Sequence, residues 1–112
     1  MKVSQRNIIL INFPFSDLTG AKVRPALVVS NDRYNSTSLD AVVLALTSNL
    51  SPSEYKVFIE KKDLESGTMP VKSAVRVDKP FSVLQGKVLK VQAKVGNAKF
   101  EEVKAAIEKL ID

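Results

Sequence analysis

Arg24 is the residue of this chain with the clearest chemical potential, because it is followed by Pro25 and the apolar run 26–29. Proline disfavours the α conformation of the residue before it, so Arg24 is expected to be extended at the start of a strand. A planar guanidinium at the rim of a rigid sheet is suited to gripping a phosphate group. The alternative is an arginine that pairs with a nearby carboxylate and solubilises a loop.

Three further polar residues lie at the ends of apolar runs or alternate with apolar residues. Thr47 follows the apolar run 41–46, whereas Arg76 and Asp78 alternate with apolar residues at period two. This period puts Arg76 and Asp78 on one face of a strand, where they could act on a ligand or form an ion pair. Thr47 could likewise act on a ligand, but a threonine at a strand end is usually a hydrogen-bonding turn residue.

These residue types match the requirements of RNA cleavage by its own 2′-hydroxyl group. That reaction needs a proton acceptor, charge stabilisation at phosphorus and a proton donor for the leaving oxygen. Arginine serves the second requirement, and a threonine hydroxyl can donate to the phosphate or orient the 2′-hydroxyl. A carboxylate such as Asp78 could transfer protons if burial raised its pKa. None of these roles needs a metal or another cofactor.

The composition of the 112 residues excludes several other chemistries. The chain has no histidine and no cysteine, which rules out a Ser-His-Asp triad, a histidine-pair ribonuclease mechanism, disulfides and thiolate metal sites. Lys and Arg number 17 against 12 Asp and Glu, which gives a net charge of +5. This balance favours a polyanionic partner.

Residues 1–112 are expected to form a single domain in the cytoplasm. The sequence has no repeat, low-complexity tract or Gly/Ser linker that would indicate a domain boundary. No apolar stretch approaches the roughly 20 residues that a membrane-spanning helix needs, so no membrane contact is expected. The apolar run near the start is too short for a signal peptide and contains Asn12 and Pro14.

The hydrophobic pattern predicts a mainly β protein that ends in an α-helix. In the last strand, Leu89, Val91, Ala93 and Val95 are expected on one face. The polar segment 30–36 is expected to be a loop with one helical turn. From Asn97, a plausible N-cap, apolar residues recur at helical spacing. Many short strands before one helix suggest a small, curved antiparallel barrel. The expected strands are 7–13, 24–30, 41–47, 55–60, 73–78 and 87–95.

A family resemblance is also carried by four segments that follow one another along the chain, 7–15, 22–32, 46–48 and 73–80. With the sequences NIILINFPF, KVRPALVVSND, LTS and SAVRVDKP, the chain resembles the MazF/PemK (Kid) family of type II toxin endoribonucleases. The resemblance implies an SH3-like antiparallel barrel with short helices and a C-terminal helix. It also implies metal-independent cleavage of single-stranded mRNA at short sequences, with 2′,3′-cyclic phosphate and 5′-OH products. The implied partners are a cognate acidic antitoxin and a second copy of the chain.

Carried over by position, the resemblance assigns catalysis to Arg24 and Thr47, and from the Kid-like branch also to Arg76 and Asp78. That branch has a catalytic histidine in the loop before the Arg-Pro pair, which this sequence lacks. Phe81 stands where relatives often have an arginine, and it is expected either to pack or to alter substrate preference. Contacts with RNA are expected from Phe15, Asp17, Thr19, Lys22, Asn31 and Ser48.

Two alternatives to an active nuclease follow from the same resemblance. The gyrase-poisoning toxins have a related barrel and act on a protein target through their C-terminal residues, so fold alone does not decide function. The chain ends in Leu110, Ile111 and Asp112, which gives that reading no positive support. An inactive family member with a structural or regulatory role is the second alternative.

Overall fold

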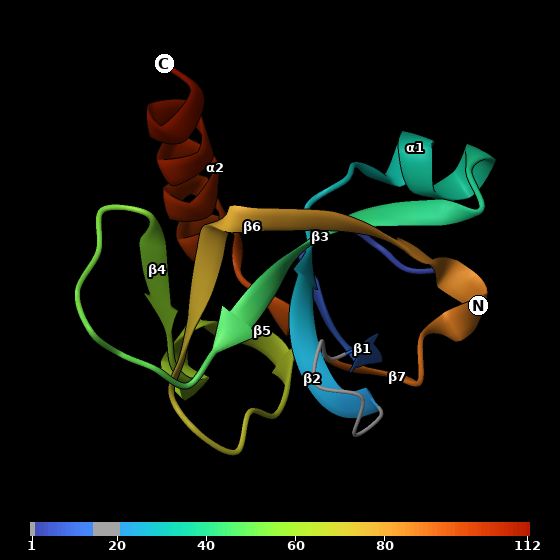
Figure 1. The fold of residues 1–112 in the computed structure, drawn as a ribbon, viewed down its shortest axis with the longest axis horizontal. Helices are drawn as coiled ribbons and strands as arrows, with labels where there is room; N and C mark the ends of the chain where they lie inside the picture. Colours follow the sequence, from blue (N-terminus) through green and yellow to red (C-terminus); the bar gives the residue numbers. More distant parts are fainter. Residues whose placement is uncertain (1, 15–20) are drawn as a thin grey trace.

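Within residues 2–14 and 21–112, which the computed structural model describes, seven strands form one antiparallel sheet in the order β4-β6-β3-β2-β1-β7-β5. The sheet curls into a half-barrel, and α2 packs on β4 and β6 (Figure 1). The predicted mainly β fold with a C-terminal helix is confirmed. The elements are β1 (Asn7–Pro14), β2 (Ala21–Val28), α1 (Asp32–Thr37), β3 (Asp40–Thr47), β4 (Lys56–Ile59), β5 (Leu64–Gly67), β6 (Ser73–Leu84), β7 (Lys90–Val95) and α2 (Asn97–Ile111).

The central strands β1, β2 and β3 are buried on both faces, which explains why they appear in the sequence as nearly continuous apolar runs. Ile8 and Leu27 point into one core cluster, whereas their neighbours Ile9 and Ala26 point into a second. Successive side chains of a strand face opposite sides, so one run of apolar residues supplies both clusters. Two buried residues of α2, Phe100 and Val103, complete the first cluster.

Strand β6 bends sharply in its first half, and this bend sets the geometry of the site (Figure 1). Its pairing with β3 shifts between Leu46↔Val75 and Leu44↔Pro80, so that residues 76–79 of β6 lie opposite a single residue of β3. Extra residues on one strand of a pair bend and twist that strand. The bend therefore carries Arg76 and the three residues after it out of the ladder with β3.

Several predicted strand boundaries differ from the structure for tertiary reasons. The strand expected at 24–30 is β2, Ala21–Val28, and the strand expected at 55–60 is β4, Lys56–Ile59. The strand expected at 73–78 is β6, which continues to Leu84 because pairing with β3 resumes after the bend. The strand expected at 87–95 starts only at Lys90, after a short 3-10 turn at Gln85–Lys87.

Strand β5 was not predicted, because its sequence Leu-Glu-Ser-Gly has neither alternation nor β-branched residues. It exists through its pairing with β7, where the backbones approach closely at Gly67. Gly67 has a φ of +82°, and a Cβ atom there would lie 2.3 Å from the carbonyl oxygen of Gln92. Only glycine fits this position without strain.

Two further predictions about β7 and α2 are wrong. The residues expected on one face differ in burial: Ala93 and Val95 are buried, whereas Leu89 and Val91 are 51% and 38% exposed. The register between β1 and β7 shifts between Ile8↔Ala93 and Ile9↔Val91, which breaks the alternation. The N-cap of α2 is the preceding glycine rather than Asn97, which is the first helical residue.

The helical turn expected within the polar segment 30–36 is present and is longer than expected, since α1 spans Asp32–Thr37. Asn31 caps this helix, since its side chain accepts a hydrogen bond from the Tyr34 amide at 2.8 Å. The buried Gln85 side chain fastens α1 to the rest of the fold by donating to the Asn35 carbonyl at 2.8 Å and accepting from the Val3 amide at 2.9 Å. In the described part of the chain, no helix is long and apolar enough to cross a membrane.

Candidate active site

Arg24 and Thr47 line the same two adjacent hollows from neighbouring strands. The pairing of β2 with β3 ends at Ala26↔Ala45, so Arg24 and Thr47 lie beyond the end of this ladder, on the two strands that it joins. Both residues, together with Leu46, line both hollows. Arg24 was predicted at the start of a strand, but β2 begins at Ala21 and Arg24 lies within it, extended as predicted. It shares both hollows with the threonine that ends the next strand.

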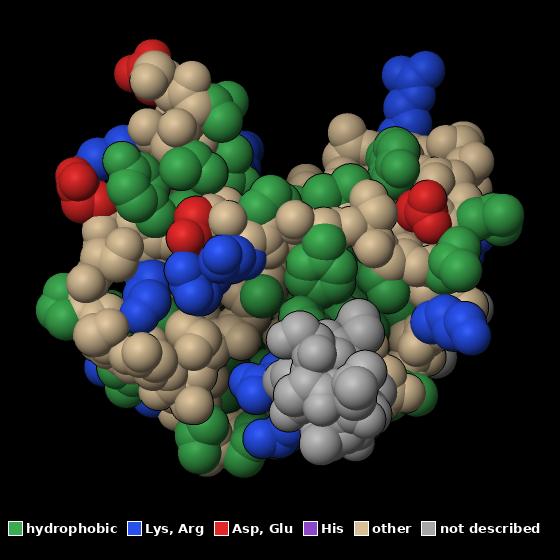
Figure 2. Space-filling view, viewed as in Figure 1, with side chains coloured by type: hydrophobic (Ala, Val, Ile, Leu, Met, Phe, Trp, Pro, Cys, Tyr) green, Lys and Arg blue, Asp and Glu red, His purple; other side chains and the backbone are tan. Residues whose placement is uncertain are grey.

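The larger hollow has a volume of about 400 Å³ and gathers cations and aromatic rings. Its cations come from two strands, β2 and the bend of β6, and its rings come from β1 and β6. Figure 2 shows Lys and Arg side chains over the bend of β6 and beside β2, next to hydrophobic side chains. The residues of this hollow that matter for chemistry are Phe13, Arg24, Thr47, Arg76, Lys79 and Phe81.

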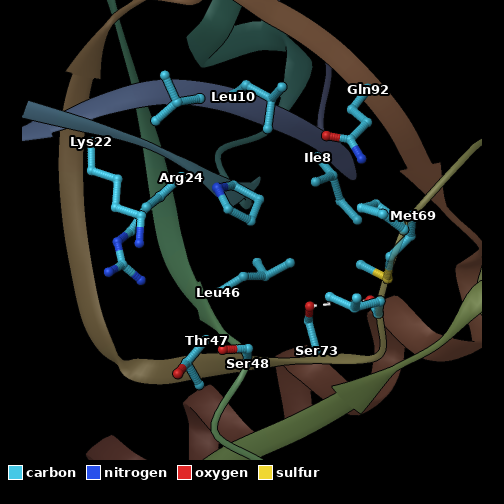
Figure 3. Close-up of a pocket in the computed structure, with 14 residues that line it drawn as sticks. Ile8, Leu10, Lys22, Arg24, Leu46, Thr47, Ser48, Met69, Ser73 and Gln92 are labelled. Atoms are coloured by element: carbon cyan, nitrogen blue, oxygen red, sulfur yellow. Dashed lines mark hydrogen bonds between the residues drawn. The ribbon is translucent and has the colours of Figure 1, made fainter.

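The smaller hollow, of about 220 Å³, is more apolar. In Figure 3, Lys22 and Arg24 lie on one wall and Thr47 and Ser48 on the facing one, with Leu46 between them. Polar groups of Ser73 and Gln92 and the thioether of Met69 complete its far side. The hollow therefore offers an apolar space with a small number of polar groups, as small-molecule and nucleotide sites commonly do.

The hydroxyl group of Thr47 is oriented by the loop that follows it. Its Oγ1 accepts a hydrogen bond from the Asn49 amide at 3.1 Å, which leaves the hydroxyl proton to be donated. Lys56 holds this loop, because its Nζ donates to the carbonyl oxygens of Asn49 at 3.2 Å and Ser51 at 3.1 Å. Thr47 is thus a turn residue, as threonine usually is at a strand end. It also lines both hollows with a hydroxyl group that can donate.

Arg76 and Asp78 form an ion pair, which was one of the two readings that their spacing allowed. Arg76 Nη2 lies 2.8 Å from Asp78 Oδ2, and both side chains are about one-third exposed. The hydrogen bond from Arg76 lowers the pKa of Asp78 below its usual value. The raised pKa that a proton-transfer role would require is therefore contradicted, because Arg76 stabilises the charged carboxylate more than burial disfavours it.

The structure brings some of the predicted RNA contacts to the site and not others. Lys22 and Ser48 line the smaller hollow. Asn31 caps α1 and lines neither hollow. The remaining three candidates, Phe15, Asp17 and Thr19, lie outside the described residues.

Sequence reasoning did not assign Lys79 or Phe13 to the site. Lys79 lies in the larger hollow, although its place in the motif 73–80 was the only available signal. Phe81 was expected either to pack or to alter substrate preference, and Phe81 and Phe13 both pack against the second core cluster. They also line the larger hollow and form an edge-to-face pair with ring centroids 5.0 Å apart.

The described residues contain no group of three or more acidic side chains that could hold a metal ion. Among the described lining residues, the polar side chains are cations and hydroxyl groups, with the amide of Gln92 in the smaller hollow and Arg76, which pairs with Asp78, in the larger one. This set can bind a phosphate and stabilise negative charge on it. Metal-independent chemistry stays a prediction.

Comparison with known families identifies the class of protein. A family model described as PemK-like, MazF-like toxin of type II toxin-antitoxin system matches residues 4–111. The chain therefore belongs to this toxin family. Comparison of the sequence with curated proteins gives no match.

Solved structures share the fold along almost the entire chain. MazE-MazF from Deinococcus radiodurans matches with a TM-score of 0.78 and 20% identity, over 99% of this chain and 97% of that one. The Mycobacterium tuberculosis toxin MazF-mt6 gives 0.77 and 14%, over 96% and 97%. A mycobacterial endoribonuclease in complex with its cognate antitoxin gives 0.72 and 16%, over 97% and 94%. At these identities the likeness establishes the fold.

Proposed function

We propose that this chain is an endoribonuclease toxin that cleaves single-stranded mRNA at short specific sequences without a metal. The observation that carries the proposal is the convergence of Arg24, Thr47 and Arg76 on one hollow from three different strands. Membership of the toxin family supports it, as does the similarity to a mycobacterial endoribonuclease. A cationic hollow with an oriented hydroxyl group suits a phosphodiester better than a neutral substrate.

In this mechanism the attacking nucleophile is the 2′-hydroxyl group of the RNA itself. Arg24 stabilises the negative charge that develops on the phosphorus oxygens, and the Thr47 hydroxyl donates to one of them or orients the 2′-hydroxyl. Arg76 supplies a second cation, which Asp78 holds in place. Because the nucleophile is internal, the products carry a 2′,3′-cyclic phosphate and a 5′-OH.

Incubation of the purified protein with unstructured RNA in EDTA tests this proposal. We expect cleavage of RNA, no cleavage when the 2′-hydroxyl is replaced by hydrogen, and loss of cleavage in Arg24→Ala. The matched control is Arg33→Ala, which removes an exposed arginine of α1 that lines neither hollow. A requirement for Mg²⁺, or equal cleavage of DNA, would contradict the mechanism.

Expression of the wild-type protein in growing cells, read together with the cleavage assay, separates the two alternatives from the nuclease. Growth arrest by the wild-type protein without RNA cleavage would indicate a toxin that binds a protein target. Neither arrest nor cleavage would indicate an inactive family member.

The partner of this toxin is proposed to be a short acidic antitoxin that covers the cationic hollow. A run of carboxylates and the RNA backbone would compete for the same cations, of which Arg76 and Lys79 lie on the bend of β6. The antitoxin complexes of a mycobacterial endoribonuclease and of MazF from Deinococcus radiodurans are similar in fold and support this pairing. We expect inhibition that is competitive with RNA, and an association rate that falls with salt. Cleavage blocked without displacement of RNA would contradict a shared groove.

A homodimer is the proposed assembly, with a twofold axis that uses the same patch on both copies. Light scattering after size exclusion should then report twice the 12.3 kDa mass of the chain. A strict monomer at micromolar concentration that still cleaves RNA would contradict a dimer-dependent site.

A further inference from the structure

The larger hollow contains an aromatic pair whose role is not explained by phosphate binding. The rings of Phe13 and Phe81 lie with centroids 5.0 Å apart at an interplanar angle of 75°. In this edge-to-face arrangement each ring keeps at least one face that its partner does not cover. Both side chains are partly exposed, and both line the hollow.

The aromatic pair is held rigidly by the sheet beneath it. Phe81 pairs with Val43 across β6 and β3, and both rings pack against the second core cluster together with Val83. Phe13 comes from β1, two strands away from β3 in the sheet. A rigid ring with few rotatable bonds offers contact area at a low entropic cost, so the pair is preorganised to bind a planar group.

Cations surround this aromatic pair on the same hollow. Lys79 and Arg76 come from the adjacent bend of β6, and Arg24 comes from the wall shared with the smaller hollow. A nucleotide carries a planar base and an anionic phosphate on one sugar, so this combination of rings and cations is complementary to one nucleotide. Single-stranded nucleic acids are commonly bound in this way, by basic grooves with aromatic side chains on which bases stack.

We propose that Phe13 and Phe81 form a stacking platform for the base of a nucleotide next to the cleaved phosphate, with Phe81 as a specificity-determining residue. The inference rests on the proposed function for the identity of the ligand as RNA. The phosphate of that nucleotide is bound by the cations of the hollow, while the base lies against the ring pair. Stacking depends on ring size and overlap, so the platform biases which base is accepted at that position.

Binding and cleavage are to be measured separately on the same variants. The cleavage substrate is a randomised RNA pool whose cut sites are sequenced, and the binding probe is a 2′-deoxy oligonucleotide pool labelled with 2-aminopurine. The fluorescence of 2-aminopurine is quenched when it stacks. The variants are Phe81→Leu, which keeps an apolar side chain of similar size, and Phe81→Tyr, which keeps the ring. Phe58→Leu is the matched control, because Phe58 is a partly buried ring on β4 that lines neither hollow.

For Phe81→Leu we expect binding weakened by about five- to hundred-fold, reduced quenching and a changed base preference at one position. Phe81→Tyr, which keeps the ring, should keep more of the quenching and affinity than Phe81→Leu, and Phe58→Leu should keep the wild-type affinity and cleavage profile. Cleavage by the wild type with an unchanged Phe81→Leu profile and affinity would overturn the platform and leave the proposed nuclease intact. Quenching without cleavage by the wild type would support the platform and overturn the nuclease.

A measurement on the wild-type chain covers the case in which Phe81→Leu does not fold. RNA containing 5-bromouridine is crosslinked to the wild-type protein by ultraviolet light, and the modified peptides are identified by mass spectrometry. Crosslinks on the peptides that contain Phe13 or Phe81 would support the platform. Crosslinks confined to other peptides would overturn it.

Discussion

Arg76 and Asp78 are joined by two parallel hydrogen bonds, from Nε to Oδ1 at 3.2 Å and from Nη2 to Oδ2 at 2.8 Å. The pair lies on the bend of β6, where the register with β3 shifts. Two bonds between planar groups fix the orientation of the guanidinium as well as its position. Asp78 therefore acts as the residue that aims Arg76 at the hollow.

Because the pKa of Asp78 is lowered by Arg76, the carboxylate stays ionised throughout the range in which the nuclease would work. Asp78→Asn is expected to slow cleavage by roughly ten-fold, as for loss of one charge-assisted hydrogen bond. The shape of the rate profile between about pH 5 and pH 8 should not change. Initial rates across this range check the prediction, and an acidic limb in the wild type that Asp78→Asn abolishes would contradict it.

The same pKa shift predicts how stability depends on pH. A carboxyl group whose pKa is lower in the folded state contributes stability above its unfolded pKa of about 4, and loses it as the pH falls through the folded value. The melting temperature of Asp78→Asn should therefore lie below that of the wild type at pH 7. This difference should shrink as the pH falls below about 4, which thermal denaturation over a pH series would show.

Arg24→Lys tests whether the fork of the guanidinium matters beyond its charge. Lysine keeps the charge at the wall between the hollows but cannot bind a phosphate in two places at once. We expect cleavage to slow by about ten- to hundred-fold, with an unchanged circular dichroism spectrum. Arg33→Lys on α1 should have wild-type activity. Full activity of Arg24→Lys would show that only net charge counts at this position.

Thr47→Val tests the hydroxyl group while keeping the shape of the side chain. Valine cannot accept the hydrogen bond from the Asn49 amide and cannot donate to a phosphate oxygen. The expected loss in cleavage rate is about ten-fold or more, and Thr47→Ser should retain part of the activity. Single-turnover kinetics measure this, and equal rates for Thr47→Val and the wild type would exclude the hydroxyl from the reaction.

Gly67→Ala is expected to destabilise the fold, because a Cβ atom would clash with the Gln92 carbonyl oxygen and the φ of +82° is strained for alanine. The expected loss in the free energy of unfolding is about 1–3 kcal/mol, measured by urea denaturation. Gly86→Ala is the control, since a Cβ atom there meets nothing within 4 Å. Equal stability of both variants would contradict the close approach of β5 to β7.

The sequence by itself determined the local features of this protein. Proline after Arg24 predicted an extended arginine, which lies within β2 and not at its start. The period of two predicted that Arg76 and Asp78 share a face, where they form an ion pair. Both predictions depend on neighbours in the chain, whose relative positions are fixed by backbone geometry alone. The ordered motifs also indicated the family, which the family model confirms.

Only the tertiary structure decided which distant residues share a hollow. The bend of β6 places Lys79 beside Arg24, and the sheet order β6-β3-β2-β1 lets the ring of Phe81 reach that of Phe13. The lowered pKa of Asp78 and the exposure of Val91 likewise arise from a hydrogen bond and a register shift in the folded chain. Local patterns carry no information on register shifts, because these are set by how whole strands pack over a shared core.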